Sequence, residues 1–308
     1  MLETVATPQL WFGFTAFVLL MLVIDLGVFH RDAHELSLKE ALSWSAVWVL
    51  LALLFNAAIY VGLGSTPALE FLTGYLIEKA LAVDNIFIFA VIFSHFSVPV
   101  AYQHRVLFWG ILGALVMRAL FIFAGAALLQ SFHGVMYVFG AFLILSGVKL
   151  LLQKDAEIHP ERNALFRIFS GMIRSVPNYE GARLFVRRQG RWFATPLFLV
   201  LISIEVTDVI FAVDSIPAIF AVTSDPFIVF TSNIFAILGL RSMYLLLAGI
   251  IDRFHYLKIG LALVLVFVGM KMVFMDIYKI PIASSLAAIA FILGVSIGLS
   301  LLRPKPAR

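Results

Sequence analysis

Glu78-Lys-Ala-Leu-Ala-Val-Asp84-Asn-Ile86 recurs in altered form as Asp208-Val-Ile-Phe-Ala-Val-Asp214-Ser-Ile216. Each stretch places an acid, five mostly apolar residues, a second acid and a small polar residue inside a strongly hydrophobic segment, and Glu205 adds a further acid. A charge at the bilayer centre costs about 2.5–3.5 kcal/mol on insertion scales. These five acids must therefore be paired, protonated or bridged by a cation.

The composition is that of an integral membrane protein. The chain has 308 residues, 62% of them hydrophobic, and a mean hydropathy of +1.04, whereas soluble domains are about half apolar. Cysteine is absent, which excludes disulfides, thiolate metal ligands and a cysteine nucleophile. The first hydrophobic segment is too long for a signal-peptide core and lacks a preceding basic region, so we expect it to be retained.

A helix needs about 20 apolar residues to cross the roughly 30 Å hydrocarbon core of a bilayer. By this measure we predict an all-α polytopic membrane protein that forms a single membrane domain with about nine transmembrane helices. The predicted spans are 8–29, 42–63, 71–94, 105–130, 134–152, 195–223, 227–250, 255–275 and 282–302.

Lysine and arginine are unevenly distributed between the two sides of the predicted bundle. One side consists of 30–41, 95–104, 153–194, 251–254 and the tail 303–308, and taken together these segments carry most of them. The opposite side has Lys279 and little else. Because basic loops face the cytoplasm, we expect the N-terminus outside and the C-terminus inside.

The basic loop 153–194 is the one sizeable segment predicted outside the membrane. Its apolar residues recur at helical spacing with arginines among them, which indicates an amphipathic helix on the inner leaflet, with a solvated linker as the alternative. The apolar positions are Leu165, Ile168, Phe169, Met172 and Ile173. The run Arg187-Arg-Gln-Gly-Arg191 can then anchor the next span at the headgroups.

The likeness between the acidic stretches continues along the chain. Four further pairs of markers follow in the same order: Ile111-Leu-Gly113 with Ile237-Leu-Gly239, Met117-Arg118 with Arg241-Ser-Met243, Phe132-His133 with Phe254-His255, and Gly147-Val-Lys149 with Gly269-Met-Lys271. The two copies, 71–152 and 195–275, have three spans each, so the second enters the membrane from the opposite face. This arrangement predicts inverted repeats whose acidic stretches meet near the midplane, flanked by two N-terminal spans (8–63) and a last span.

Helix geometry limits how these acids can converge. Glu78 and Asn85 are seven residues apart and share a face, as do Asp208 and Ser215, but an unbroken helix does not point all the acids at one place. Pro217 follows closely in the second stretch. We therefore expect a partly unwound helix there, which would expose carbonyls that bind ions.

The predicted metal ligands are all oxygen donors. They are Glu78, Asp84, Asn85, Glu205, Asp208, Asp214 and Ser215. Such a set suits Mn²⁺, Mg²⁺ or Ca²⁺, and the absence of cysteine and of histidine among the acids argues against zinc or copper. The alternative is that the acids pair with cations that hold the bundle together or act as counter-charges: Lys79, Arg118 and Arg241.

Enzymatic and nucleic-acid functions find no support in the sequence. It has no P-loop, no nucleophile elbow and no HExxH motif. Neither Asp84 nor Asp214 lies in a Gly-x-Gly-Asp motif of the kind that would suggest an aspartyl protease. We therefore expect no enzymatic activity, no prosthetic cofactor and no nucleic-acid partner.

Two segments carry a family likeness. The first is Glu78-Lys-Ala-Leu-Ala-Val-Asp84-Asn-Ile-Phe, and the second runs from Thr195-Pro-Leu-Phe-Leu-Val through Ile204-Glu-Val-Thr-Asp208 to Ser224-Asp-Pro-Phe. With the basic loop ending Phe185-Val-Arg-Arg, the likeness covers nearly the whole chain. The sequence resembles the TerC family of integral membrane proteins, within the LysE-type transporter superfamily, and most of all its Alx-type branch.

The resemblance implies a function and a site. Members of this branch are linked to manganese export and to tolerance of alkaline conditions or tellurite, and the likeness implies a metal path formed by Glu78, Asp84, Glu205, Asp208 and Asp214. We accordingly expect Mn²⁺ export from the cytoplasm across a bacterial inner membrane, with protons entering as the ion leaves. Two alternatives stay open: an exchanger of Ca²⁺ or another divalent cation, and a non-transport membrane scaffold in a metal or tellurite stress-response complex. The expected partners are the lipid bilayer, the metal ion and protons, and oligomer formation is left open.

Overall fold

The computed structural model describes residues 4–27, 38–152, 174–247 and 256–302, without the side chains of residues 25–27, Leu38 and Asp84. This part of the chain is mostly helical. Its elements are α1 (Pro8–Gly27), α2 (Leu38–Leu63), α3 (Ser65–His95), α4 (Val100–Ser131), α5 (Val135–Leu152), β1 (Phe185–Arg188), β2 (Arg191–Ala194), α7 (Pro196–Phe220), α8 (Pro226–Leu238), α9 (Leu240–Leu247), α10 (Leu257–Val273) and α11 (Ile282–Leu302). The predicted all-α membrane fold is confirmed.

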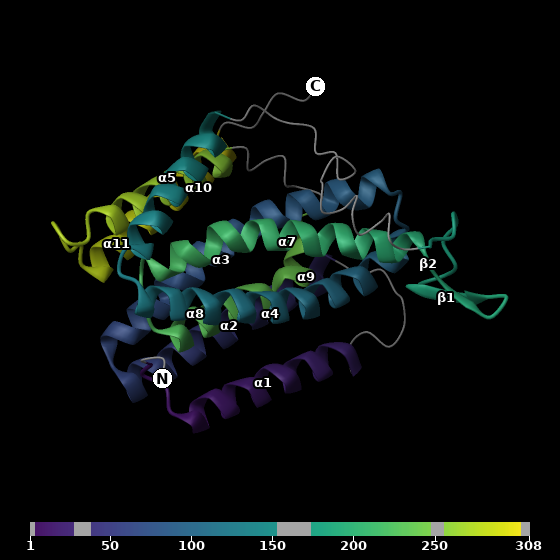
Figure 1. Ribbon diagram of the computed structural model, residues 1–308, viewed down its shortest axis with the longest axis horizontal. Coiled ribbons are helices and arrows are strands. Elements are labelled where there is room, and N and C mark those ends of the chain that lie inside the picture. The colour runs from purple at the N-terminus through teal and green to yellow at the C-terminus, as the bar shows by residue number, and fades with distance from the viewer. Residues whose placement is uncertain (1–3, 28–37, 153–173, 248–255, 303–308) are drawn as a thin grey trace.

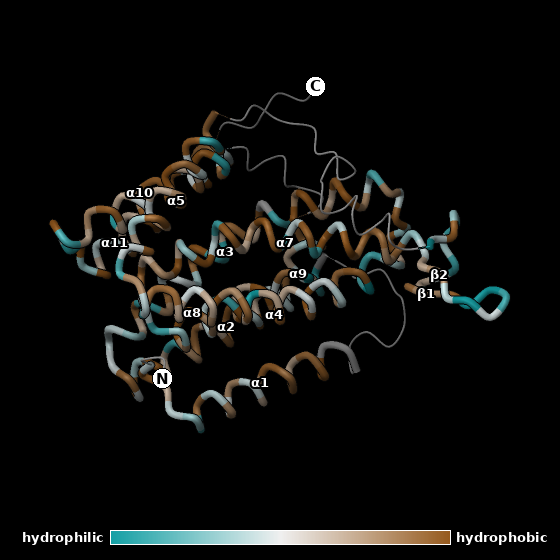
Figure 2. The backbone as a smooth tube through the Cα atoms, viewed as in Figure 1, coloured by the Kyte–Doolittle hydropathy of each residue, from teal (hydrophilic) through white to brown (hydrophobic). Residues whose placement is uncertain are grey.

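The helices form two groups (Figure 1). α3, α4, α7 and α8 pack on one another at the centre of the first group, with α2 against α3 and α9. α5, α10 and α11 form the second group, which joins the first through α3 and α7. The acidic helices α3 and α7 are therefore surrounded by other helices along much of their length. Hydrophobic residues predominate along the helices (Figure 2), and many large hydrophobic side chains are exposed.

An aromatic cluster joins the N-terminal helices to the centre of the fold. Phe14 of α1 contacts Phe55 of α2, and both rings contact Phe235 of α8, with centroids 4.9–5.8 Å apart. Trp11 meets Phe227 edge-on at 5.0 Å. Because lipid is as apolar as these side chains, close packing rather than water exclusion holds such helices together.

Glycines bring α5 and α10 into backbone contact. A methyl group at Gly269 would lie 2.7 Å from the Gly140 carbonyl oxygen, and one at Gly147 would lie 2.7 Å from the Ala262 carbonyl oxygen. Small residues at a helix interface allow this close approach in membranes. The two helices therefore pack as one tight pair.

The contacts of this pair follow the predicted repeat. The repeat matches Gly147 with Gly269, and the same shift along the chain matches Gly140 with Ala262. The contact between Gly147 and Ala262 is thus exchanged with the contact between Gly269 and Gly140. An internal two-fold axis would produce this exchange, while the inverted orientation of the halves in a membrane stays a prediction.

Fewer helices satisfy a strict length and polarity criterion than the nine predicted spans. Within the described residues, five helices are long and apolar enough to cross a membrane, or six if α8 and α9 form one bent span. α3 is 31 residues long but contains Glu70, Glu78, Lys79 and Asp84. The predicted count of nine therefore stays a prediction, although each predicted span overlaps a helix.

The expected unwinding near Pro217 is wrong. α7 is helical from Pro196 to Phe220 with Pro217 inside it. Pro217 lacks the N–H that would donate to the Val213 carbonyl oxygen, but the helix continues for only three residues beyond it. The break lies instead at Gly239, where α8 and α9 meet at an angle of 41°.

The end of the basic loop forms a β-hairpin, which the sequence interpretation missed. β1 and β2 pair antiparallel around Gln189 and Gly190, whose φ angles are +50° and +77°. A two-residue turn with both residues at positive φ is the usual hairpin connection, so Gln-Gly between two short apolar-basic runs was the available signal. The predicted amphipathic helix at Leu165–Ile173 lies outside the described residues.

Candidate functional site

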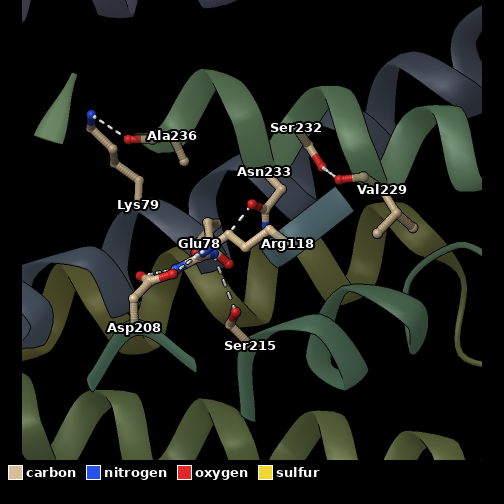
Figure 3. A network of polar contacts seen from close by, with 9 residues as sticks. All are labelled: Glu78, Lys79, Arg118, Asp208, Ser215, Val229, Ser232, Asn233 and Ala236. Carbon is tan, nitrogen blue, oxygen red and sulfur yellow. Dashed lines mark hydrogen bonds and ion pairs between the residues drawn. The ribbon is translucent and has the colours of Figure 1, made fainter. Parts of the chain in front are cut away.

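Arg118 of α4 lies at the centre of a buried polar cluster (Figure 3). Its Nε donates to Oδ2 of Asp208 at 3.2 Å, and its Nη2 donates to Oδ1 of the same carboxylate at 3.0 Å. Parallel bonds of this kind are the strongest pairing that an arginine makes. The pair fixes α4 against α7 in the interior of the bundle.

The second amino group of Arg118 reaches three more side chains. Nη1 donates to Oε1 of Glu78, to Oδ1 of Asn233 at 3.2 Å and to Oγ of Ser215 at 3.5 Å. Glu78 comes from α3 and Asn233 from α8, so four helices meet at this one guanidinium. All five residues are buried.

The cluster has more negative than positive charge. Glu78 and Asp208 carry two carboxylates and Arg118 one guanidinium, which leaves one formal negative charge. Oε2 of Glu78 and Nδ2 of Asn233 are buried without a hydrogen-bond partner in the described structure. Burying a polar atom without a partner costs free energy. The Glu78 Oε2 is therefore an oxygen that could still bind a cation.

The predicted helix faces explain which residues meet. Asp208 and Ser215 are two turns apart on α7, and both contact Arg118. Asn85 is two turns beyond Glu78 on α3, where it is 1% exposed and its Oδ1 has no hydrogen-bond partner in the described structure. A cavity of about 10 Å³, room for about one water molecule, borders Asp208, Gly110 and Leu240.

Lys79 leaves the cluster in another direction, toward the break between α8 and α9. Its Nζ donates to the Ala236 carbonyl oxygen at 3.3 Å and lies 6.0 Å from the Tyr75 ring centroid. A methyl group at Gly239 would lie 2.9 Å from this Nζ. Gly239 thus leaves room for a positive charge at the carbonyl end of α8, where the helix dipole favours it.

Glu205 and Asp214 make their contacts elsewhere. The Glu205 carboxylate packs onto Gly113 of α4 so closely that any side chain at that position would overlap it. Asp214 accepts a hydrogen bond of 2.7 Å from Ser146 of α5, and Lys149 is close enough to interact with it electrostatically. Because α7 is unbroken, the separation of six positions between Asp208 and Asp214 turns the second carboxylate about 120° away.

The seven predicted ligands therefore do not meet at one point. Glu78, Asp208 and Ser215 are brought together, Asn85 is buried on the same face as Glu78, and the Asp84 side chain lies outside the described residues. Within the described residues, no group of three or more acids and histidines is placed to hold a metal ion. A shared metal site stays a prediction.

The cation partners also differ from one another. Among the described side chains, Arg118 forms ion pairs with Glu78 and Asp208, Lys79 donates to a backbone carbonyl oxygen, and Arg241 is buried in α9 at 4% exposure. Asn233 and Ser146 join the polar contacts although they are not among the predicted ligands. The sequence signal is a polar residue in an apolar helix, Ser146 on its own and Asn233 directly after Thr231 and Ser232, but it does not reveal a partner on another helix.

Comparison with known proteins places the chain in a family. A family model described as "Integral membrane protein TerC family" matches residues 63–306 of this chain. This chain belongs to the TerC family. The matched region begins just before α3 and includes the whole Arg118 cluster, and the resemblance drawn from the acidic stretches is confirmed.

Relatives of this TerC protein match over almost its full length. A membrane protein of Myxococcus xanthus, described as uncharacterized, is 58% identical over 99% of this chain and 95% of its own. The "putative membrane-bound redox modulator Alx" of Escherichia coli K12 is 53% identical over 95% of this chain and 94% of its own. A Rickettsia bellii membrane protein is 41% identical, with 95% and 97% covered. No solved structure matches this TerC protein.

Proposed function

We propose that this TerC protein is a secondary transporter that exports a divalent cation, with Mn²⁺ as the leading candidate. Glu78 and Asp208 hold the ion. The observation that carries the proposal is the buried cluster in which two carboxylates from different predicted repeats share one arginine. Acids inside a membrane protein mark ion pathways by default because of their cost there. Hard oxygen donors such as these suit Mn²⁺ as cargo.

Arg118 has a defined part in this proposal. Without an ion, its guanidinium neutralises one of the two carboxylate charges. A divalent cation that enters competes for the same oxygens, and the unpaired Oε2 of Glu78 gives it a first point of contact. When the ion departs, the guanidinium returns, so the site never remains as two unpaired buried charges.

Protons are the proposed counter-ion. Protonating a carboxylate ligand lowers its affinity for a metal, so protons that enter from outside would favour release. The name of the Escherichia coli relative describes that protein as a redox modulator. This chain has no cysteine for thiol exchange, so an effect on cellular redox balance would be indirect, for example through the level of a redox-active metal.

The test is Mn²⁺ flux in proteoliposomes that contain a manganese-sensitive dye. Glu78→Gln and Asp208→Asn should each lower the initial rate at least about tenfold, because each removes a proposed ligand. Glu180→Gln and Asp276→Asn remove acids outside the membrane helices and serve as matched controls with the parent rate expected. Parental flux in both ligand variants, at equal protein levels, contradicts the proposal.

The same assay separates the remaining candidates. Adding Ca²⁺ or Mg²⁺ in competition measures selectivity, since the oxygen donors alone suit all three ions. Asp84→Asn and Asp214→Asn test whether the other predicted acids belong to the ion path. A scaffold would show no metal flux in the purified parent protein.

A further inference from the structure

The segment 174–195 holds a concentration of positive charge outside the transport cluster. It contains five arginines and one acid, Glu180, which gives a net charge of +4, equal to that of the whole chain. All five arginines are exposed: Arg174, Arg183, Arg187, Arg188 and Arg191. The rest of the chain is therefore formally neutral.

The hairpin in this segment is fixed to the start of α7. The Thr195 hydroxyl donates to the Arg183 carbonyl oxygen at 2.6 Å, and the Thr195 N–H donates to the Leu184 carbonyl oxygen at 3.0 Å. The Phe185 and Phe198 rings are in contact, with centroids 4.4 Å apart. Its arginines are thus held at a set position relative to a membrane helix.

Cross-strand pairing sorts the side chains onto two faces. Arg188 is paired with Arg191 on one face, and Arg187 is paired with Trp192 on the other. The first face borders an open cleft of about 880 Å³ whose apolar floor includes Val176, Pro177 and Phe193. Glu180 pairs with Arg188, so the cleft keeps a net positive charge.

The hairpin also lies close to the membrane surface. Trp192 is 67% exposed and four residues before Pro196, so it is at most about 13 Å from the start of α7. Exposed tryptophans gather at the headgroup level of membranes. The hairpin extends past the end of α7 (Figure 1), and its tip is hydrophilic (Figure 2).

We propose that Arg188 and Arg191 bind the phosphate of an anionic phospholipid headgroup of the cytoplasmic leaflet. Guanidinium groups match phosphate oxygens in pairs, which a lysine cannot do. The apolar floor of the cleft receives the glycerol and upper acyl carbons. An acidic protein or a nucleic acid would also use the charge, but the attachment of the hairpin to the start of a membrane helix favours a lipid headgroup. The proposal is independent of the transport function.

The absence of cysteine provides a specific probe. Asn178→Cys places a single thiol on an exposed residue beside the cleft for an environment-sensitive fluorophore. The labelled full-length protein is reconstituted in phosphatidylcholine nanodiscs with 0 to about 40% phosphatidylglycerol. We expect a saturable change in emission that depends on phosphatidylglycerol and weakens at about 0.5 M salt, because salt screens exposed charges.

Arginine variants identify the site. Each arginine near an anionic surface contributes about fivefold to affinity, so Arg188→Gln/Arg191→Gln should raise the half-saturating phosphatidylglycerol fraction about 25-fold, beyond the measured range. Arg183→Gln, also exposed but outside the cleft lining, is the matched control: it should raise the half-saturating fraction about fivefold at most, well short of the double variant.

Three results would overturn the proposal. One is the same emission with and without phosphatidylglycerol. The second is a double variant that responds like Arg183→Gln although gel filtration and circular dichroism show it to be folded. The third is a full response to millimolar inorganic phosphate in pure phosphatidylcholine nanodiscs, which would make free phosphate the ligand.

Discussion

At the residue scale, Arg118 decides what the central cluster can do. Its planar group makes a two-bond pair with Asp208 while its remaining amino group reaches Glu78, Asn233 and Ser215. A lysine has one compact charge and cannot serve both carboxylates in this geometry. The cluster therefore depends on the shape of the cation as well as its charge.

Removing this cation should destabilise the protein strongly. Arg118→Gln leaves Glu78 and Asp208 buried without a positive partner, and breaking a buried pair in this way costs about 3–5 kcal/mol. The free energy of unfolding of Arg118→Lys should lie between that of Arg118→Gln and that of the parent. The measurement is denaturant unfolding in detergent micelles.

A double variant checks the cause of this loss. Arg118→Gln/Asp208→Asn removes one charge of each sign, so part of the stability should return, and the pair should be non-additive because the groups are in contact. Additive losses would mean that Arg118 acts by packing alone.

The same scale shows how far the sequence could predict the site. Seven-residue spacing correctly grouped Asp208 with Ser215, because helical periodicity holds wherever the helix is continuous. It could not place Glu205, whose position depends on the space left by Gly113 of another helix. It also could not reveal that Asp214 meets Ser146, since partner choice across helices is a tertiary property.

At the element scale, the close packing of α5 against α10 depends on glycine. Gly140 and Gly269 put the two backbones in contact, and the Ile144 backbone nitrogen would lie 3.0 Å from a methyl group at Gly269. These are backbone neighbours, so they cannot give way as a flexible side chain would. Any larger residue must push the helices apart.

A pair of alanine substitutions tests this packing. Gly269→Ala should destabilise the protein by about 1–3 kcal/mol through overpacking. Gly294→Ala in α11 is the matched control, because a methyl group there meets nothing within 4 Å, and better helix propensity should leave stability unchanged or raise it by up to about 1 kcal/mol. Equal unfolding midpoints for the two variants would refute the packing argument.

Element boundaries show a second limit of sequence reading. Each hydrophobic run overlaps a helix, but some helices begin before the run does. α3 begins at Ser65 and α4 at Val100, several residues before the predicted starts. Pro217 suggested a break that the helix tolerates, whereas Gly239 gave a weak signal for the real one. Gly239 also leaves room for Lys79 Nζ, a contact made by a distant segment that the sequence alone does not show.

At the scale of the whole molecule, the uneven distribution of basic residues predicts the orientation in the membrane. Single cysteines at Asn178 and Lys279 would lie on opposite sides, since the chain has no other thiol. In intact cells, a membrane-impermeant maleimide should label the cysteine at 279 and leave the one at 178 unlabelled until the cells are lysed. The reverse pattern would invert the predicted topology and the proposed direction of transport.

The formal charge of the buried trio has one more consequence. Glu78, Asp208 and Arg118 together carry one negative charge, and a bound divalent ion would change that to one positive charge. Moving two positive charges outward against an interior-negative voltage takes roughly 4.6 kcal/mol per 100 mV. Export through this cluster would therefore generate an electric current unless protons return the charge, and membrane voltage would join ion concentration in setting its rate.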